Sequence, residues 1–318
     1  MLYGKKLSFG DTVGLIGPSG AIRTEGTLEK AIAETERMGF KVKLGESAGQ
    51  HYGSLSGTDE LRARDVNNMF RDDSVDAIFC LRGGYGTMRM LDLLDYEIMA
   101  ANPKVFLGYS DITAMHIAML EKANLVTFHG PMPASCWSDA PLDDFSRESL
   151  YRTLMCAEPV GELVNPPEIP RKTINPGACE GMLVGGNLSL VTGVLGTPWE
   201  LDTRGRILFL EDIGEYTYKL DHMFTHMRLA GKFDDCAGIV LGDYRNCEIE
   251  HPGFGFTLEE LVRDIIAPCG KPIFMGLQAG HCTPKLTLPL GVQARMDADS
   301  CTLTILESAV RTDNCCRA

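Results

Sequence analysis

Ser110 is the residue of this sequence best placed to act as a catalytic nucleophile. It follows the apolar segment 105–109 and precedes the helical segment 112–122. A serine at such a turn directs its hydroxyl toward a helix N-terminus, where backbone N–H groups can stabilise an oxyanion. This is the arrangement of a nucleophile elbow, although the final glycine of the G-x-S-x-G pattern is missing. The alternative is that Ser110 only caps the helix.

Glu211 and His281 are the residues that could activate such a nucleophile. Glu211 ends the apolar segment 207–210, and a carboxylate at a strand end can orient a histidine and stabilise its imidazolium. His281 follows the segment 273–280, which ends in glycine, and its position suits a general base. Taken alone, each has an ordinary alternative: Glu211 as an acid at a helix start, and His281 as a loop histidine.

A glycine-rich turn, Arg82-Gly83-Gly84-Tyr85-Gly86, follows the strong apolar segment 75–81. Glycines let a backbone approach a ligand closely and expose its N–H donors, so this turn could supply half of an oxyanion hole facing Ser110. A nucleotide site is disfavoured because the sequence lacks G-K-[ST] and has no G-x-G-x-x-G in the proper context. The alternative is a tight strand-to-helix turn.

His222 and His226 have the i, i+4 spacing of two metal ligands on one helix face. The glutamate of an H-E-x-x-H motif is absent from this run, and the 11 cysteines include no C-x-x-C pair. We therefore expect these histidines to pack or make interface contacts, and we expect neither a metal nor a cofactor.

The elements that position these residues alternate between strands and helices in the first part of the chain. Strands are predicted at 13–16, 42–44, 75–81, 105–109 and 125–128, with helices at 27–38, 59–70, 85–94 and 112–122. This alternation predicts a doubly wound parallel sheet over residues 1–135. Ligands of such sheets bind beyond the carboxyl ends of the strands, where the turns containing Ser110 and Gly83 would lie.

The rest of the chain departs from this rhythm. Residues 136–175 are rich in proline and are interpreted as a linker. Residues 176–318 contain several apolar segments separated by glycine-rich turns, with two good helices near 215–230 and 257–267. We expect a second, β-rich mixed α/β domain there, which would contribute Glu211 and His281.

Composition narrows the possible partners and the compartment. The formal net charge of −13 disfavours binding to nucleic acid or to an anionic membrane. The sequence contains no run of about 18 uncharged apolar residues, so we expect no membrane span. The N-terminus also lacks the apolar region of a secretory signal. Scattered cysteines in apolar segments indicate reduced thiols, so we expect a cytoplasmic protein.

Seven short segments, taken together and in this order, resemble the LD-carboxypeptidase family of serine peptidases. They are LIGPS (15–19), RGGYG (82–86), GYSD (108–111), HGP (129–131), GGNL (185–188), LED (210–212) and GH (280–281). The family includes muropeptide LD-carboxypeptidases and the microcin C self-immunity peptidase. Each segment is weak alone, but their joint occurrence nearly spans the chain.

The resemblance implies a Ser110, Glu211 and His281 triad, and an oxyanion hole from the backbone at Gly83 or Gly84 and at Asp111. It also implies a flavodoxin-like N-terminal domain, a β-rich C-terminal domain and a homodimer. The implied reaction is release of terminal D-Ala from a murein tetrapeptide through an acyl-enzyme, in cell-wall recycling. Arg82 and Tyr85 are the candidate substrate-binding residues, and Arg82 or Arg245 would suit the D-Ala carboxylate.

Two other functions stay open at this point. The same fold and triad could cleave a peptidyl nucleotide of the microcin C kind. Ser110 and Glu211 are 101 positions apart, which resembles the compact murein-recycling members more than the microcin branch. A ligand-binding α/β protein without catalysis is the third possibility, although all three triad residue types are present.

Overall fold

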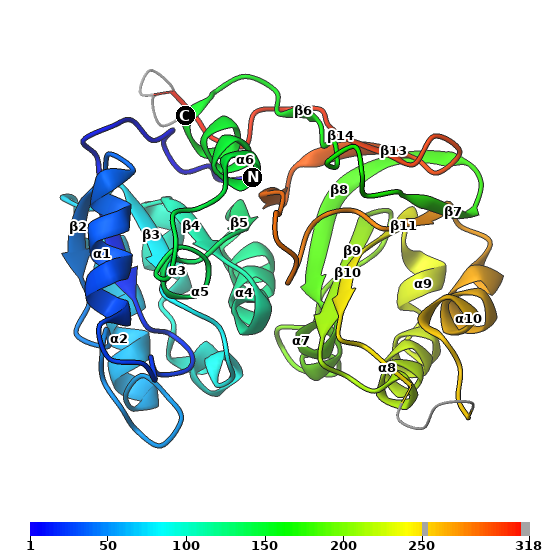
Figure 1. Ribbon diagram of the computed structural model, residues 1–318, viewed down its shortest axis with the longest axis horizontal. Helices are drawn as coiled ribbons and strands as arrows, with labels where there is room; N and C mark the ends of the chain where they lie inside the picture. Colours follow the sequence, from blue (N-terminus) through cyan, green and yellow to red (C-terminus); the bar gives the residue numbers. More distant parts are fainter. Residues whose placement is uncertain (250–253, 313–318) are drawn as a thin grey trace.

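The structure is a computed structural model that describes residues 1–249 and 254–312. Two β-sheets lie side by side, with helices packed against them (Figure 1). This confirms the prediction of an α/β protein with an N-terminal doubly wound sheet and a β-rich mixed C-terminal part.

In the described residues the first sheet has six strands, in the order β12-β5-β4-β3-β1-β2. Five of these are parallel: β1 (Thr12–Ile16), β2 (Lys41–Leu44), β3 (Ala77–Cys80), β4 (Val105–Gly108) and β5 (Thr127–His129). Strands β3 and β4 are buried along their whole length, as expected for parallel strands covered on both faces. The sixth strand, β12 (Leu288–Leu290), pairs antiparallel with β5 and comes from the C-terminal part of the chain.

The helices of this half follow the predicted alternation. They are α1 (Thr27–Arg37), α2 (Asp59–Arg71), α3 (Tyr96–Ala101) and α4 (Thr113–Ala123). The helix expected over 85–94 is instead a 3-10 helix, η1 (Thr87–Leu93). It starts after Gly86, whose φ of 115° lies outside the helical range, so the glycine-rich turn extends further than predicted.

Residues 136–175, expected as a linker, also carry secondary structure of their own. The segment begins at the end of α5 (Pro133–Cys136) and contains α6 (Asp144–Met155), β6 (Gly161–Glu162) and β7 (Lys172–Asn175). Asp143 caps α6 by accepting a hydrogen bond from the Ser146 N–H, and Leu150 and Leu154 bury its apolar face. Strands β6 and β7 form the two edges of the second sheet.

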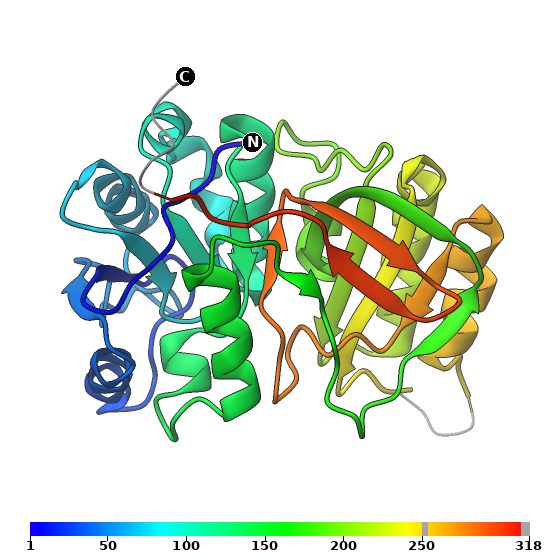
Figure 2. The same ribbon diagram turned by 90° about the horizontal axis from the view of Figure 1, so that it is seen from above.

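Eight strands of the described chain form the second sheet, in the order β6-β14-β13-β8-β9-β10-β11-β7. Its parallel centre consists of β8 (Ala178–Asn187), β9 (Ile207–Ile213), β10 (Gly238–Arg245) and β11 (Ile273–Met275). Strands β13 (Gln293–Asp297) and β14 (Thr302–Ile305) extend it antiparallel beyond β8 (Figure 2).

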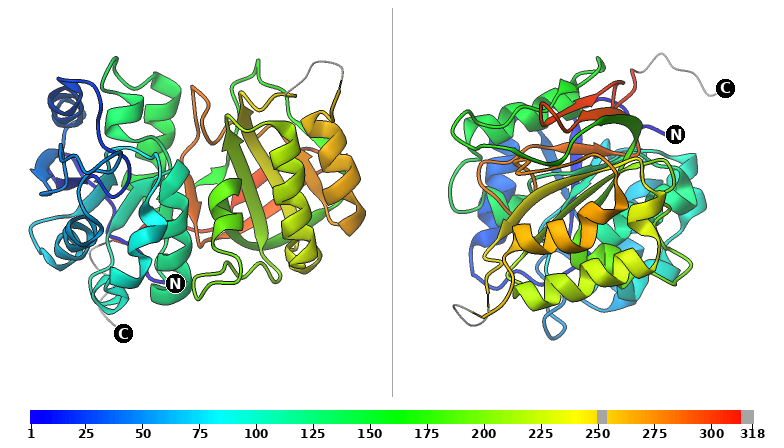
Figure 3. Two further views of the ribbon diagram at one scale, coloured as in Figure 1. Left: turned by 90° about the horizontal axis from the view of Figure 1, so that it is seen from below. Right: turned by 90° about the vertical axis from the view of Figure 1, so that its right-hand side faces the viewer.

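The helices of the second half lie mainly on one face of this sheet (Figure 3). They are α7 (Leu188–Gly193), α8 (Thr217–Leu229), α9 (Lys232–Asp235) and α10 (Leu258–Leu261), with a π-helical turn over Val262–Ile266 and a 3-10 turn over Ala267–Cys269. None of the helices in the described ranges could cross a membrane.

Apolar packing runs from one sheet to the other. One buried cluster joins Phe106 and Met115 of the first half to Leu188 and Leu208 of the second. The halves share a core, and β12 joins the first sheet. The predicted domain boundaries, after residue 135 and before residue 176, therefore do not separate two independent units of packing. We retain these boundaries only as a proposal.

Candidate active site

Ser110 lies at the carboxyl end of β4, where the chain turns into a short 3-10 helix and then α4. Its φ is 66°, in the left-handed region that a residue with a Cβ atom rarely adopts. A strained turn of this kind lifts the side chain out of the line of the strand, as in a nucleophile elbow. The side chain is half-buried, and its hydroxyl forms no hydrogen bond with another described residue.

The glycine-rich turn lies directly against Ser110, and Gly83 is the residue that faces it. A Cβ atom at Gly83 would lie 2.8 Å from the Ser110 Cβ, 2.9 Å from its Oγ and 3.5 Å from the Asp111 nitrogen. Gly84 has a φ of 131° and instead faces Gly20, whose Cα would lie 3.1 Å from a Cβ there. The two glycines therefore have different neighbours, and only Gly83 borders the hydroxyl.

The side chain of Asp111 holds the two turns together. It is buried, and it accepts hydrogen bonds from the Ser19 hydroxyl at 2.6 Å and from the Thr87 N–H at 3.0 Å. The Thr87 hydroxyl donates in turn to the Asp111 carbonyl at 2.6 Å. Burial raises the pKa of this carboxyl above its ordinary value, while the hydrogen bonds oppose the rise. The hydrogen bonds of the carboxylate thus go to Ser19 and Thr87, and only the backbone of Asp111 faces Gly83 and Ser110.

Glu211 and His281 meet across 70 positions of sequence. Nδ1 of His281 lies 2.7 Å from Oε2 of Glu211, and the glutamate side chain is completely buried. A carboxylate acceptor keeps the proton on Nδ1, which leaves Nε2 free to accept a proton as a base. The histidine side chain keeps 11% of its surface exposed, so it can reach a substrate.

Gly280 allows this close approach. Its φ is 116°, and a Cβ atom there would lie 2.6 Å from Oε2 of Glu211. Glu211 itself is fixed within β9, where it pairs with Asn187 of β8. Its other oxygen, Oε1, is buried and has no hydrogen-bond partner among the described residues. The charge of this carboxylate is therefore directed at the imidazole.

Tyr109 connects this pair to the nucleophile. It immediately precedes Ser110, and the centre of its ring lies 4.9 Å from that of His281. The ring is buried, and burial raises the pKa of its hydroxyl well above the ordinary value. Ser110 and His281 thus lie on opposite halves of the molecule but adjoin the same aromatic residue.

The two halves are also tied together beside the site. The Asn187 N–H donates a hydrogen bond to the Thr113 hydroxyl at 3.0 Å, and Thr113 begins the helix behind Ser110. Gly186 makes room for this contact, because a Cβ atom there would lie 2.7 Å from Oγ1 of Thr113. The Asn187 side chain donates to Asp212, which follows Glu211. These bonds fix β4 relative to β9.

The predicted substrate-binding residues lie beside the site but differ in their exposure and in the partners that they already have. Arg82 is half-buried and donates to the carbonyls of Ala21, at 2.7 Å, and Gly83, at 3.2 Å. Burial lowers the pKa of its guanidinium. Tyr85 is 55% exposed. Arg245 forms an ion pair with Asp243 at 3.3 Å.

His222 and His226 are exposed on α8, where they line a shallow cavity with Glu215 and Met223. Across the described ranges, no group of three or more His, Cys, Asp or Glu side chains is arranged to hold a metal ion.

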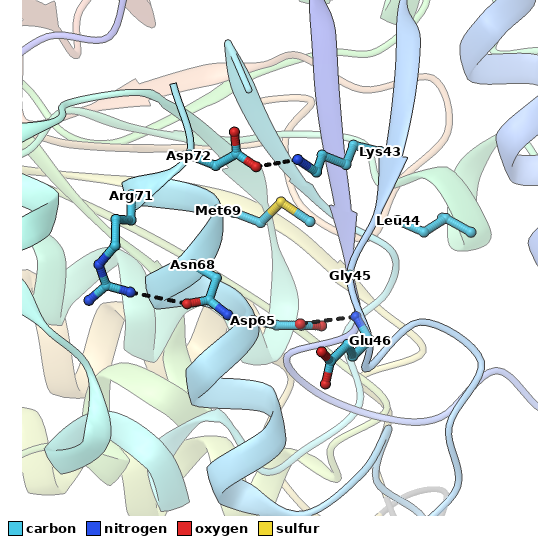
Figure 4. A pocket seen from close by; sticks show the side chains of 9 residues that line it. All are labelled: Lys43, Leu44, Gly45, Glu46, Asp65, Asn68, Met69, Arg71 and Asp72. Carbon is cyan, nitrogen blue, oxygen red and sulfur yellow. Dashed lines mark hydrogen bonds and ion pairs between the residues drawn. The ribbon is translucent and has the colours of Figure 1, made fainter. Parts of the chain in front are cut away.

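A separate cavity of about 420 Å³ lies between β2 and α2, at the edge of the first sheet farthest from the second (Figure 4). Polar groups that line it bond to each other: Lys43 forms an ion pair with Asp72, and Arg71 donates a hydrogen bond to the Asn68 side chain. It is three strands away from the strand that carries Ser110, so it is not part of this site.

The chain matches two family models, one in each half of the sequence. Residues 13–130 match the LD-carboxypeptidase N-terminal domain, and residues 180–296 match the LD-carboxypeptidase C-terminal domain. The chain belongs to the LD-carboxypeptidase family. Membership makes it a hydrolase of the carboxypeptidase type, and the family resemblance of the seven short segments is confirmed.

Individual relatives of the LD-carboxypeptidase family cover almost the whole chain. It is 40% identical over 304 residues to the "Probable murein peptide carboxypeptidase" of Bacillus subtilis (strain 168), covering 95% of this chain and 93% of that one. It is 30% identical to the murein tetrapeptide carboxypeptidase of Pseudomonas aeruginosa, covering 90% and 93%. The solved structure of MccF in complex with glutamyl sulfamoyl guanosine has a TM-score of 0.89 at 27% identity, covering 98% and 100%.

Several residues that lie beside this candidate site are not among those predicted from the sequence. Tyr109 and Gly280 adjoin predicted site residues, so the spacing alone could have drawn attention to them. Asn187 lies in a segment that carried the family resemblance, but its role in joining the halves depends on tertiary contact. Lys285, which is buried against the Tyr109 ring, had no signal, because a lysine in a polar loop is normally exposed.

Proposed function

We propose that this chain is a serine carboxypeptidase that releases terminal D-Ala from murein tetrapeptides in cell-wall recycling. The single observation that carries the proposal is the 2.7 Å contact between buried Glu211 and His281, one aromatic ring away from the strained turn at Ser110. The names of the B. subtilis and P. aeruginosa relatives support murein peptide as the substrate class.

In the proposed mechanism, His281 takes the proton of the Ser110 hydroxyl as the oxygen attacks the scissile carbonyl. Glu211 stabilises the imidazolium that forms. The backbone N–H groups of Gly83 and Asp111 would hold the oxyanion, because Gly83 is the glycine that borders Ser110. His281 then returns the proton to the amine of the leaving D-Ala, and water hydrolyses the acyl-enzyme.

Arg82 and Tyr85 are proposed to contact the substrate from the glycine-rich turn. Tyr85 is exposed and Arg82 half-buried, so both could border a peptide bound over Gly83. We further propose that the enzyme acts in the cytoplasm as a homodimer, without a nucleic-acid or membrane partner. The free thiols of the described cysteines and the net charge of −13 support this setting.

A second candidate function is cleavage of an aminoacyl or peptidyl nucleotide of the microcin C kind. The structural similarity to MccF over nearly all of both chains favours it. The two functions share the nucleophile and differ in the leaving group, which is an amino acid in one and a nucleotide derivative in the other.

A fluorophosphonate probe followed by peptide mapping tests the serine mechanism. We expect one adduct, on Ser110, and its loss when His281 is replaced by alanine. An unlabelled protein that still hydrolyses the tetrapeptide would contradict the mechanism. Parallel incubation with the tetrapeptide and with an acyl-sulfamoyl adenylate distinguishes the two substrates, and we expect cleavage of the tetrapeptide.

A further inference from the structure

Lys285 is a buried lysine beside the candidate active site with no anionic partner. Only 4% of its surface is exposed. Its ammonium lies 3.9 Å from the centre of the Tyr109 ring and 3.7 Å from the sulfur of Cys136. Among all residues that the structure describes, no Asp or Glu carboxylate lies within 4.0 Å of it.

A buried ammonium ordinarily has a carboxylate or several carbonyl oxygens around it, because the hydration that it loses on burial must be replaced. A thiol is a weak acceptor, and the face of an aromatic ring returns only a part of the lost hydration. Lys232, the other buried lysine of the second half, shows the usual arrangement, since it pairs with Glu200 and with the Leu201 carbonyl. The surroundings of Lys285 therefore lack an anion.

The position of this cation is informative. It lies on the loop that begins with His281, four residues further along, and it packs on Tyr109, the residue before Ser110. The other face of the candidate site is formed by the His281 ring, 4.9 Å from the Tyr109 ring. The Lys285 ammonium and the His281 ring therefore both contact the Tyr109 ring, and Tyr109 is the residue before the nucleophile Ser110.

The other cations near the site already have partners. Arg82 donates to two main-chain carbonyls, and Arg245 is paired with Asp243. Both were candidates for reading a carboxylate, and the structure gives each another partner. Of the three, Lys285 alone lacks an oxygen partner among the described residues.

We propose that Lys285 binds the terminal carboxylate of the substrate and thereby makes the enzyme a carboxypeptidase. This inference rests on the proposed function and deepens it. The substrate carboxylate supplies the missing counter-ion, and its distance from Ser110 selects the last peptide bond. Tyr109 forms the wall between the carboxylate subsite and His281, so its ring sets that distance.

The experiment compares two substrates that differ only in this charge: the tetrapeptide with a free D-Ala carboxylate, and the same peptide ending in D-Ala amide. Cleavage is followed by chromatography of the tripeptide product. For the wild type, we expect kcat/KM to be on the order of 100-fold higher for the free acid, as for other buried charge pairs. Lys285→Met should lose about that factor on the acid and change less than about threefold on the amide.

Two matched variants separate recognition from folding. Lys285→Arg keeps a positive charge and should keep the preference for the acid. Lys232→Met removes a buried lysine outside the site and should leave the ratio of the two substrates unchanged.

The possible outcomes differ clearly. An equal loss on acid and amide in Lys285→Met would overturn the inference and assign Lys285 a structural role. Equal cleavage of both substrates by the wild type would overturn it even if no variant folds. The proposed function survives both of those results, whereas a wild type that cleaves neither peptide contradicts the proposed function and the inference with it.

Discussion

Nδ1 of His281 and Oε2 of Glu211 lie 2.7 Å apart, although 70 positions separate the residues in the sequence. The glutamate is fully buried on β9, whereas the histidine lies on a loop with part of its ring exposed. This is the relationship expected of a base and the acid that orients it, and it leaves Nε2 directed away from the carboxylate.

Replacing the carboxylate by an amide should abolish most of the activity without unfolding the protein. In Glu211→Gln the side chain keeps its shape, but it can no longer stabilise an imidazolium and can favour the wrong tautomer. We expect kcat to fall on the order of 10⁴-fold, as in other triads. Steady-state kinetics and circular dichroism measure the two effects, and an activity within about tenfold of wild type would contradict this role.

Gly280→Ala tests whether the Glu211–His281 geometry matters in detail. The added methyl would lie 2.6 Å from Oε2 of Glu211, so one of the two side chains must move. A misplacement of about 1 Å can cost on the order of 100-fold in rate, and we expect a loss of that size in kcat.

Gly270→Ala is the matched control for this substitution. Gly270 also has a positive φ, 70°, but a Cβ atom there meets nothing within 4 Å. It should lose about 1 kcal/mol of stability through backbone strain and keep its kcat. Equal kcat values for the two variants would show that the contact at Gly280 is unimportant.

The local arrangements were predictable from the sequence, whereas the contacts between halves were not. The position of Ser110 between a strand and a helix follows from apolar segments and their boundaries. So does the placing of Glu211 on a strand, although β9 continues to Ile213, past the predicted end at residue 210. The 3-10 helix after Gly86 was missed because successive glycines leave the backbone without a strong preference. Helix α6 was hidden by the prolines around it, although Asp143 followed by Leu150 and Leu154 is an ordinary capped helix.

Other features depend on long-range packing that one sequence does not reveal. Strand β12 is three residues long and joins the first sheet from more than 150 positions away from β5. Its apolar pattern is equally consistent with a strand of the second sheet. Likewise, nothing local distinguishes Lys285 from an exposed loop lysine, because its burial results from Tyr109 and Cys136.

Two buried histidines behind the nucleophile predict an acid-sensitive fold. Burial lowers the pKa of His116 from 6.5 to about 4, and it lowers the pKa of His129 well below 6.5. Below the ordinary pKa the unfolded chain binds protons that the folded chain does not, so stability present at neutral pH is lost as the pH falls. For His116 alone, the loss between about pH 8 and about pH 5 is about 2 kcal/mol.

Urea denaturation of wild type and His116→Phe at these two pH values measures this effect. Phenylalanine keeps an aromatic ring against Phe106, whose ring lies 5.8 Å from that of His116. The variant should lose less stability than the wild type on acidification, whatever its stability at neutral pH. Identical losses in both proteins would show that protonation of His116 does not cause the loss of stability on acidification.

Activity should not require a metal ion. The proposed chemistry uses Ser110, His281 and backbone N–H groups, and the described part of the chain offers no cluster of three metal-ligating side chains. We expect full activity after exhaustive dialysis against EDTA. A loss of activity with EDTA that zinc restores in the wild type but not in His222→Ala would instead place a metal on α8.

The proposed function has Ser110 cleave the bond between an L-centre and a terminal D-Ala. A carboxypeptidase holds the substrate carboxylate at a fixed distance from its nucleophile, so the scissile carbonyl always belongs to the penultimate residue. In a pentapeptide ending in D-Ala-D-Ala that residue has the opposite configuration, which moves either its side chain or its carbonyl out of place.

The decisive measurement is the free D-Ala that the wild type and Ser110→Ala release from the tetrapeptide L-Ala–D-Glu–diamino acid–D-Ala. We expect rapid release by the wild type and none measurable by a folded Ser110→Ala, with the pentapeptide left largely uncut by both. Release of D-Ala by folded Ser110→Ala at the wild-type rate would show that Ser110 is not the nucleophile. A wild type that cleaves an acyl-sulfamoyl adenylate but releases no D-Ala would show that murein peptide is not the substrate.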